Sequence, residues 1–454
     1  MLQRRTLLPL LAAGLLLAGC AATPNGTDRP PIVFVHGNGD SASIWQTTVW
    51  RFESNGWPRD RLHAIDLPYP LARDEDGKTQ PGRTSTAEHM AYLKAEVEGV
   101  LKRTGARQVV LVANSRGGNA VRNYVQNGGG ASTVSHAVLG GTPNHGVWAI
   151  KGFREGNEFS GTGPFLTGLN APKNAAGDEM TGPVQWMTIR SDNNDKFAQP
   201  DGLWIGAKGT ATNVGFDGPA LKGATNVVIP RIDHRETSFS PAAFDATWRF
   251  ITGAAPAPTA VVPEARIVLD GKITGLGLVP TGPHANNLPL PGARLEIYAT
   301  DPATGERRGE AVHRKTVAAN GRWGPFTAQP GVSYEFVVAA EGYATTHIYR
   351  SPFPRSSDLI HLRAERLAAA DRNAGSVVNF TRPRGYFDLE RDRMGLDGKP
   401  LPGVGPGGAG VSSAKLLIQA PQPRPVAAEF NGEKLVGRSW SASENRTVTL
   451  ELTY

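Results

Sequence analysis

Short apolar runs alternate with segments of helical periodicity along residues 31–253, and this alternation constrains the fold more than any other feature. The runs at residues 32–35 and 109–112 consist of Val, Ile, Leu and Phe, which is typical of strands buried on both faces. Residues 86–104 repeat apolar positions at helical spacing. Further strands are expected at residues 62–67, 134–139, 184–191 and 227–229. The alternation predicts an α/β fold, with a parallel sheet and helices on both of its faces.

The pattern changes after residue 253. Residues 254–263 are rich in Pro and Ala, which is typical of an extended linker. Beyond the linker, alternating apolar segments are separated by turn signals such as Asn-Gly, and they predict one or two β-sandwich domains. We expect the first at residues 264–365 and the second at residues 376–454, with a helical pattern only at residues 363–372.

The N-terminus carries the features of an export signal. A pair of arginines precedes an apolar stretch too short to span a bilayer as a helix, and the stretch ends in Leu-Ala-Gly before Cys20. This ending is similar to a lipobox, which implies that residues 1–20 are a lipoprotein signal ending at a lipidated Cys20. Residues 21–30 are then a tether. Acyl chains on Cys20 would anchor the protein in the cell envelope, and Ala21 is typical of sorting to an outer membrane. The alternative is a cleaved signal and a secreted protein.

Composition excludes some classes of function. The formal net charge of +7 is small for 454 residues and the basic residues are scattered, which argues against a nucleic-acid partner. Cys20 is the single cysteine, so no intramolecular disulfide can form. No later apolar run reaches membrane-spanning length. We therefore expect membrane contact through the lipid anchor at Cys20.

One serine lies where a buried strand meets a helix. Residues 109–112 lead through Ala113 and Asn114 to Ser115, and a helical pattern begins after it. The tight turn of a nucleophile elbow requires small residues two positions before and two positions after the serine, and Ala113 and Gly117 meet this requirement. We predict Ser115 as the nucleophile of an acyl-transfer reaction, with Asn114 in place of the usual histidine.

The oxyanion formed in such a reaction needs main-chain N–H donors. His36 and Gly37 directly follow the first strand, where the loop of an acyl-transfer enzyme supplies one donor. We predict an oxyanion hole made by the N–H groups of Asn38 and Arg116. The alternative for His36 and Gly37 is a simple turn that ends the strand.

An acid and a histidine should follow the serine in that chain order. His234 lies just beyond the strand at residues 227–229, where a loop allows the imidazole to reach the serine. Asp192 and Asp195 both follow the strand at residues 184–191. We prefer Asp195, because the apolar residues after it favour an inward-facing carboxylate, whereas Asp192 would bond its own backbone in a turn. Spacing alone leaves both open.

Residues 31–253 resemble the secreted lipases of the α/β-hydrolase superfamily. The resemblance lies in His-Gly at residues 36–37, Ala-x-Ser-x-Gly at 113–117, Gly-Gly-Thr-Pro-Asn-His-Gly at 140–146 and His234 before a helix. It implies lipase or carboxylesterase activity on esters or lipids with hydrophobic acyl groups. The resemblance also implies that the chemistry proceeds through an acyl-enzyme, without a metal or organic cofactor.

The β-rich residues after the linker resemble the C-terminal domains of prokaryotic long-chain lipases, and residues 288–362 are also similar to a carboxypeptidase-regulatory-type β-sandwich. These domains would position substrate, shield the site or bind envelope components. Residues 146–183 form a long, aromatic connection between two core strands. We interpret it as a lid or acyl-binding wall, or alternatively as a crossover helix with an irregular loop.

Two other functions are open. A polyester depolymerase or an amidase would use the same triad, because pocket shape decides the substrate. A surface protein with an inactive hydrolase domain would bind envelope components instead, but it would not need serine, aspartate and histidine in workable order.

Overall fold

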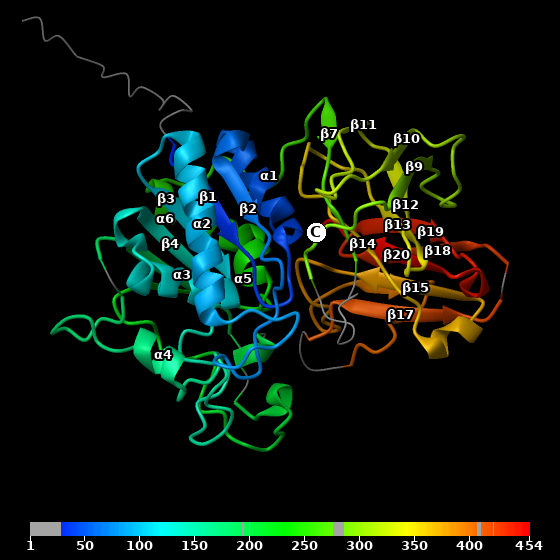
Figure 1. Ribbon diagram of the computed structural model, residues 1–454. Helices are drawn as coiled ribbons and strands as arrows, with labels where there is room; N and C mark the ends of the chain where they lie inside the picture. Colours follow the sequence, from blue (N-terminus) through cyan, green and yellow to red (C-terminus); the bar gives the residue numbers. More distant parts are fainter. Residues whose placement is uncertain are drawn as a thin grey trace, which may run out of the picture.

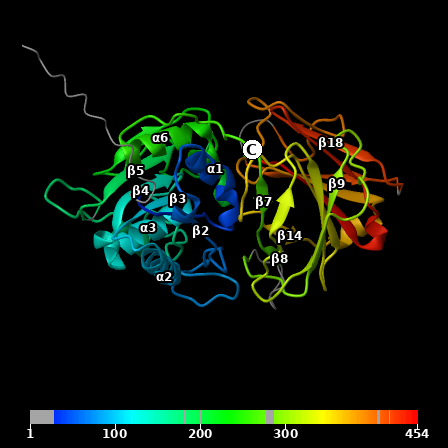
Figure 2. The same ribbon diagram turned by 90° about the horizontal axis from the view of Figure 1, so that it is seen from above.

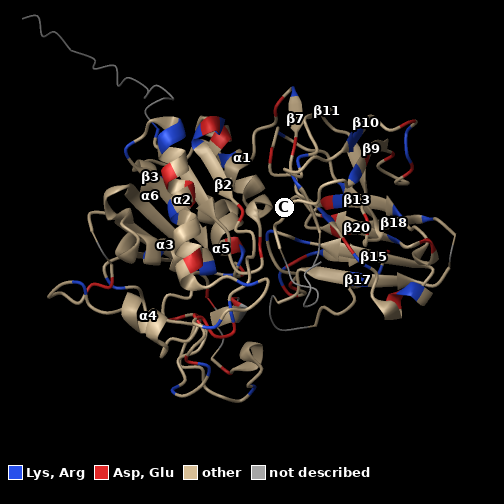
Figure 3. Cartoon of the chain, in the orientation of Figure 1, with Lys and Arg blue, Asp and Glu red and all other residues tan. Residues whose placement is uncertain are grey.

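The computed structural model describes residues 29–180, 182–192, 195–198, 200–275, 286–405, 410–420 and 422–454. The predicted lipoprotein signal, Cys20 and nearly all of the tether lie outside these residues. An N-terminal part, residues 29–253, and a β-rich C-terminal part, residues 264–454, lie side by side (Figure 1). Basic and acidic residues are interspersed over both parts (Figure 3). Across the described ranges, no helix combines the length and the apolar character that a bilayer crossing requires.

The N-terminal part is built on a six-stranded sheet in which all strand pairs are parallel. The strand order is β2-β1-β3-β4-β5-β6. The strands are β1 (Ile32–Val35), β2 (Leu62–Ile65), β3 (Val109–Asn114), β4 (Val134–Gly140), β5 (Gln185–Arg190) and β6 (Thr225–Val228). They overlap the six expected strand segments, with β6 beginning two residues earlier than expected, so the predicted parallel α/β sheet is confirmed.

Helices cover both faces of this sheet, as predicted (Figure 2). The helices are α1 (Gln46–Ser54), α2 (Thr86–Thr104), α3 (Arg116–Asn127), α4 (Pro164–Leu169), α5 (Glu236–Phe239) and α6 (Pro241–Thr252). Because alternate residues of a strand face opposite sides, Val33 of β1 packs in the core with α2 and α3, and Phe34 packs with α1 and α6. The inner strands β1 and β3 are therefore buried on both faces, which explains their continuous apolar runs.

The C-terminal part contains a seven-stranded sheet with the order β10-β9-β12-β13-β20-β15-β17. Its strands are β9 (Arg294–Thr300), β10 (His313–Thr316), β12 (Ser333–Ala339), β13 (Thr345–Arg350), β15 (Ser376–Thr381), β17 (Ser413–Ile418) and β20 (Arg446–Glu451). Strand β20 pairs in parallel with β13 on one side and with β15 on the other. Strands from residues 264–365 and from residues 376–454 therefore share one sheet.

Three smaller sheets pack against the large one. They consist of β7 (Ile267–Leu269) with β11 (Phe326–Ala328), β8 (Ile273–Gly275) with β14 (Leu362–Ala364), and β16 (Met394–Leu396) with β18 (Pro425–Phe430) and β19 (Glu433–Arg438). The helix predicted at residues 363–372 is wrong. Leu362 and Ala364 point into the core from β14, and only a short 3-10 helix, Ala369–Asn373, follows.

Buried contacts join the two parts. Trp50 of α1 packs in the apolar core of the C-terminal part, and its indole N–H donates to the carbonyl of Ser356 at 2.8 Å. Asp66, after β2, accepts from His361 at 2.8 Å and forms an ion pair with Lys272. These groups hold the pKa of the Asp66 carboxyl well below its usual range, against the effect of its burial. The C-terminal part is therefore packed against the N-terminal part rather than tethered to it.

Candidate active site

Ser115 occupies a sharp turn between β3 and α3. Its backbone angles are φ 52° and ψ −123°, which are strained for a residue with a side chain. The N–H of Ser115 donates to the carbonyl of Gly140 at 2.8 Å, which fixes the turn to the end of β4. The turn thus has the strand-to-helix geometry of a nucleophile elbow.

Gly117 is required at this turn because a side chain there has no room. A Cβ atom at Gly117 would lie 2.6 Å from the main-chain oxygens of both Val35 and His36, at the end of β1. We expect Gly117→Ala to displace this strand end, to cost about 1–3 kcal/mol in the free energy of unfolding, and to lower kcat about 100-fold. Thermal unfolding and ester hydrolysis would measure both effects.

Gly168 provides the matched control, because a Cβ atom there meets nothing within 4 Å. It lies in α4, and we expect Gly168→Ala to leave both stability and turnover close to those of the wild type. If Gly117→Ala and Gly168→Ala had the same stability and the same turnover, this would contradict the close contact between Gly117 and the end of β1.

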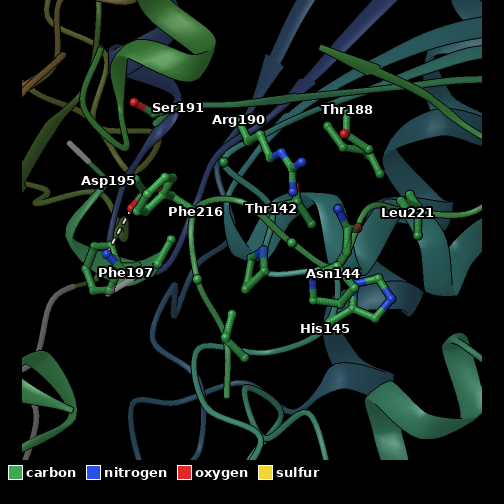
Figure 4. Close-up of a pocket in the computed structure, with 18 of the residues that line it drawn as sticks. Thr142, Asn144, His145, Thr188, Arg190, Ser191, Asp195, Phe197, Phe216 and Leu221 are labelled. Carbon is green, nitrogen blue, oxygen red and sulfur yellow. Dashed lines mark hydrogen bonds between the residues drawn. The ribbon is translucent and has the colours of Figure 1, made fainter. Parts of the chain in front are cut away.

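His234 lies in the loop between β6 and α5, and Asp195 lies in the loop after β5. The two side chains are buried, and His234 Nδ1 and Asp195 Oδ2 are hydrogen-bonded at 2.8 Å (Figure 4, dashed line). Asp195 Oδ1 accepts from the N–H of Phe197 at 2.9 Å, and the Phe197 ring packs edge-on against the imidazole at 4.6 Å. The apolar residue after Asp195 thus orients the pair.

Asp192, the other candidate acid, lies elsewhere. Its Oδ2 accepts from the N–H of Arg231 at 3.0 Å, and its Oδ1 accepts from the Ser191 hydroxyl at 3.2 Å. The structure therefore brings Asp195, and not Asp192, to His234.

The predicted oxyanion residues flank Ser115. Arg116 follows it directly and begins α3, and Asn38 lines the same cavity as Ser115. The Asn38 side chain is used structurally, because its Oδ1 accepts from the N–H of Ala72 at 2.8 Å. The Arg116 guanidinium is buried and makes a bidentate ion pair with Glu158 at 2.7 and 2.8 Å. The Arg116 side chain is thus turned to structural contacts, which leaves its main chain beside the serine.

His36 and Asn114 have structural contacts. His36 Nε2 accepts from the N–H of Leu67 at 3.1 Å while Nδ1 donates to the carbonyl of Gly37 at 2.9 Å, and burial lowers the pKa of its imidazole. A neutral His36 therefore braces the loop after β1. Asn114 is fully buried, and its amide donates to Ser238 Oγ at 3.0 Å, which ties the elbow to the helix after His234.

Ser115 and His234 line one cavity of about 290 Å³. Its apolar walls come from the long connection between β4 and β5 and from the loop after β5: Val147, Trp148, Phe159, Phe197, Trp204 and Ile205. The cavity lining also includes three charged residues, Asp40, Arg154 and Arg235, and one residue of the C-terminal part, Tyr386. A second, smaller pocket is also lined by Asp195 and His234, with Thr142, Asn144 and Phe216 in its wall (Figure 4).

Sequence reasoning did not find Tyr386, Arg235 or Glu158. Tyr386 reaches the cavity from a part of the chain more than 100 residues beyond the linker, and no local pattern marks such a contact. Glu158 had a signal, since a buried arginine after the serine requires a carboxylate partner. Among its described residues the long connection contains the single short helix α4, so that described part is irregular over most of its length.

A serine on a strained turn after a central strand of a parallel sheet, with an Asp–His pair beyond the later strands, defines the α/β-hydrolase class. Comparison with protein-family models relates the chain to particular groups within the α/β-hydrolase class. Residues 29–158 match the model of class 2 lipases, and residues 265–367 match the model of the lipase C-terminal domain. The N-terminal part is therefore similar to class 2 lipases and the C-terminal part to the lipase C-terminal domain, and these matches support an ester hydrolase.

Similar solved structures include lipase B of Aspergillus fumigatus, at 14% identity, 52% coverage of this chain, 56% coverage of that chain and a TM-score of 0.36. The mature lipase BlEst2 of Bacillus licheniformis is 20% identical over 49% of this chain and 89% of that chain, with a TM-score of 0.32. A curated relative, the non-heme haloperoxidase of Rhodococcus erythropolis, is 27% identical over 119 residues, or 26% of this chain. The match spans 39% of that relative's length.

Proposed function

We propose that the protein is a serine hydrolase, a lipase or carboxylesterase, that cleaves carboxylic esters of hydrophobic acyl groups. Ser115 is the nucleophile, His234 the general base and Asp195 the acid that orients it. The main-chain N–H groups of Asn38 and Arg116 form the oxyanion hole. The observation that carries the proposal is the cavity shared by Ser115, on its strained turn, and the His234 imidazole that bonds Asp195.

The reaction proceeds in two halves. The Ser115 hydroxyl attacks the ester carbonyl and gives its proton to His234 Nε2, while Asp195 holds the Nδ1–H and stabilises the imidazolium. The tetrahedral oxyanion collapses, and the alcohol leaves with the proton from His234. Water then attacks the acyl-enzyme by the same route, which releases the carboxylic acid and restores Ser115. Each oxyanion-hole donor contributes about 3 kcal/mol to lowering the barrier.

The cavity supports a hydrophobic acyl group. Its walls include Trp148, Phe159 and Ile205, and apolar walls favour apolar ligands through the area they remove from water. Val147, Trp148 and Phe159 belong to the long connection, so we propose that this segment forms the acyl-binding wall.

Hydrolysis of p-nitrophenyl esters from acetate to palmitate, by residues 21–454, tests this function. We expect turnover with an optimum above the shortest chains, and covalent labelling of Ser115 by a fluorophosphonate, read by mass spectrometry. Absence of both from folded protein would reject the proposed function. Turnover of acetate alone would retain the mechanism and reject the hydrophobic specificity.

We also propose that the protein is exported and anchored through lipid on Cys20. The support is the lipobox-like ending before the single cysteine. Metabolic labelling with a fatty-acid analogue should mark the wild type in the membrane fraction, and Cys20→Ser should abolish the label. Label retained by Cys20→Ser would contradict the anchor.

A further inference from the structure

The loop that carries His234 is held by residues of the C-terminal part. Arg382 and Arg391, which follow β15, form ion pairs with Asp233 and Glu236 on either side of His234. We call these four side chains the arginine clamp. The two carboxylates belong to the N-terminal part, so the clamp crosses the boundary between the parts.

Both carboxylate oxygens of Asp233 accept hydrogen bonds, and the two oxygens bind different parts of the molecule. Oδ1 accepts from the N–H groups of Arg235 at 2.9 Å and Glu236 at 3.0 Å, which fixes the turn around His234. Oδ2 accepts from Arg382 Nη1 at 3.0 Å and from the N–H of Tyr386 at 2.7 Å. One fully buried side chain therefore shapes the histidine turn and binds the C-terminal part.

Glu236 makes a second connection between the histidine turn and the two arginines of the C-terminal part. Its Oε1 accepts from Arg382 Nη2 at 2.5 Å, and its Oε2 accepts from Arg391 Nη1 at 2.6 Å. Oε2 also accepts from the N–H of Asp233 at 2.8 Å, so the carboxylates of the clamp brace each other's backbone. Arginine suits this position because its planar fork bonds two carboxylates at fixed angles.

The arginine clamp also binds a residue that lines the cavity of Ser115. Both guanidinium groups donate to the carbonyl of Tyr386, at 2.5 Å from Arg382 and 3.0 Å from Arg391. The Tyr386 ring lines the cavity of Ser115 and lies under the guanidinium of Arg235, at 5.1 Å. The same short segment thus holds the histidine turn and contributes to the wall around the serine.

We propose that Arg382 and Arg391 are positioning residues of the hydrolase, which hold Asp233 and thereby the orientation of His234. This inference rests on the proposed function. A buried carboxylate that loses its cation is strongly unfavourable, so the turn would rearrange when either arginine is removed. A displacement of the base by about 1 Å is enough to lower turnover about 100-fold.

Arg382→Ala and Arg424→Ala form the test pair. Arg424 is also a bidentate arginine of the C-terminal part, but it pairs with Asp397 at 2.6 and 2.7 Å within that part. We expect Arg382→Ala to lower kcat by about 10- to 100-fold with KM changed less than about threefold. Added guanidinium ion should restore part of the kcat that Arg382→Ala loses. The kcat of Arg424→Ala should stay close to that of the wild type without added guanidinium.

Hydrogen exchange gives a readout that does not need turnover. We expect the amides of residues 233–239 to exchange at least about tenfold faster in Arg382→Ala than in Arg424→Ala. Unchanged kcat with unchanged exchange would overturn the inference, as would loss of stability alone. If Arg382→Ala does not fold, Arg391→Ala and Asp233→Asn test the same clamp. A wild type that neither turns over esters nor reacts with fluorophosphonate would instead reject the proposed function, and the exchange comparison would still decide the clamp.

Discussion

Replacing Ser115 by alanine is expected to lower kcat by at least about 10⁴-fold, because the attacking oxygen is lost while the rest of the site is kept. Alanine retains the Cβ atom, so the strained turn between β3 and α3 changes little. The unfolding temperature should therefore stay within about 3 °C of the wild type. Steady-state kinetics with p-nitrophenyl butyrate and thermal unfolding measure the two quantities.

The Ser115→Ala variant should retain a small residual activity that does not depend on the serine hydroxyl. Oxyanion-hole donors and binding alone leave some catalysis over water, so the remaining rate should be small but measurable. Fluorophosphonate labelling should disappear completely. A Ser115→Ala protein with near wild-type turnover would place the nucleophile elsewhere and overturn the proposed mechanism.

Replacing Asp195 by asparagine is expected to lower kcat by about 10³- to 10⁴-fold. The amide is nearly isosteric, but it cannot stabilise the imidazolium that forms as Ser115 attacks. It also leaves the His234 tautomer unfixed, because an amide can donate to Nδ1 as well as accept from it. KM should change little, because Asp195 bonds His234 and does not line the cavity of Ser115.

Asp192→Asn is the matched control for this prediction. Asp192 bonds the main chain of Arg231 and the hydroxyl of Ser191. In asparagine the amide oxygen can accept from the Arg231 N–H, and the amide nitrogen can donate to the Ser191 hydroxyl oxygen. We expect turnover within about threefold of the wild type. A severe loss in Asp192→Asn with a mild loss in Asp195→Asn would reverse the assignment of the acid.

Much of the N-terminal part could be predicted because its signals are local. Strands β1 and β3 are short apolar runs buried on both faces, and α2 repeats its apolar positions along one face. The elbow at Ser115 has a local signature too, in the small residues Ala113 and Gly117 two positions on either side of the serine, although the clash that requires Gly117 comes from the end of β1. Local patterns of this kind are present in the sequence before any tertiary contact forms.

The remainder depends on contacts between distant residues. Spacing could not choose between Asp192 and Asp195, because three residues of loop decide which carboxylate faces the histidine. The helical spacing at residues 363–372 was misleading because Leu362 and Ala364 also alternate, and pairing with β8 made them a strand. The arginine clamp had no signal at all, since Asp233 and Arg382 are 149 residues apart in the chain.

The position of β20 has a consequence for the order of assembly. Residues 446–451 are late in the sequence but form an interior strand of the seven-stranded sheet, between β13 and β15. The two sides of that sheet cannot join until this segment has been synthesised, and Arg382 follows β15 directly. The partners that fix the histidine turn are thus completed after the serine turn, which is made from the first third of the chain. During synthesis the turn of the proposed nucleophile Ser115 can therefore form long before the turn of the proposed base His234 gains its contacts with Arg382 and Arg391.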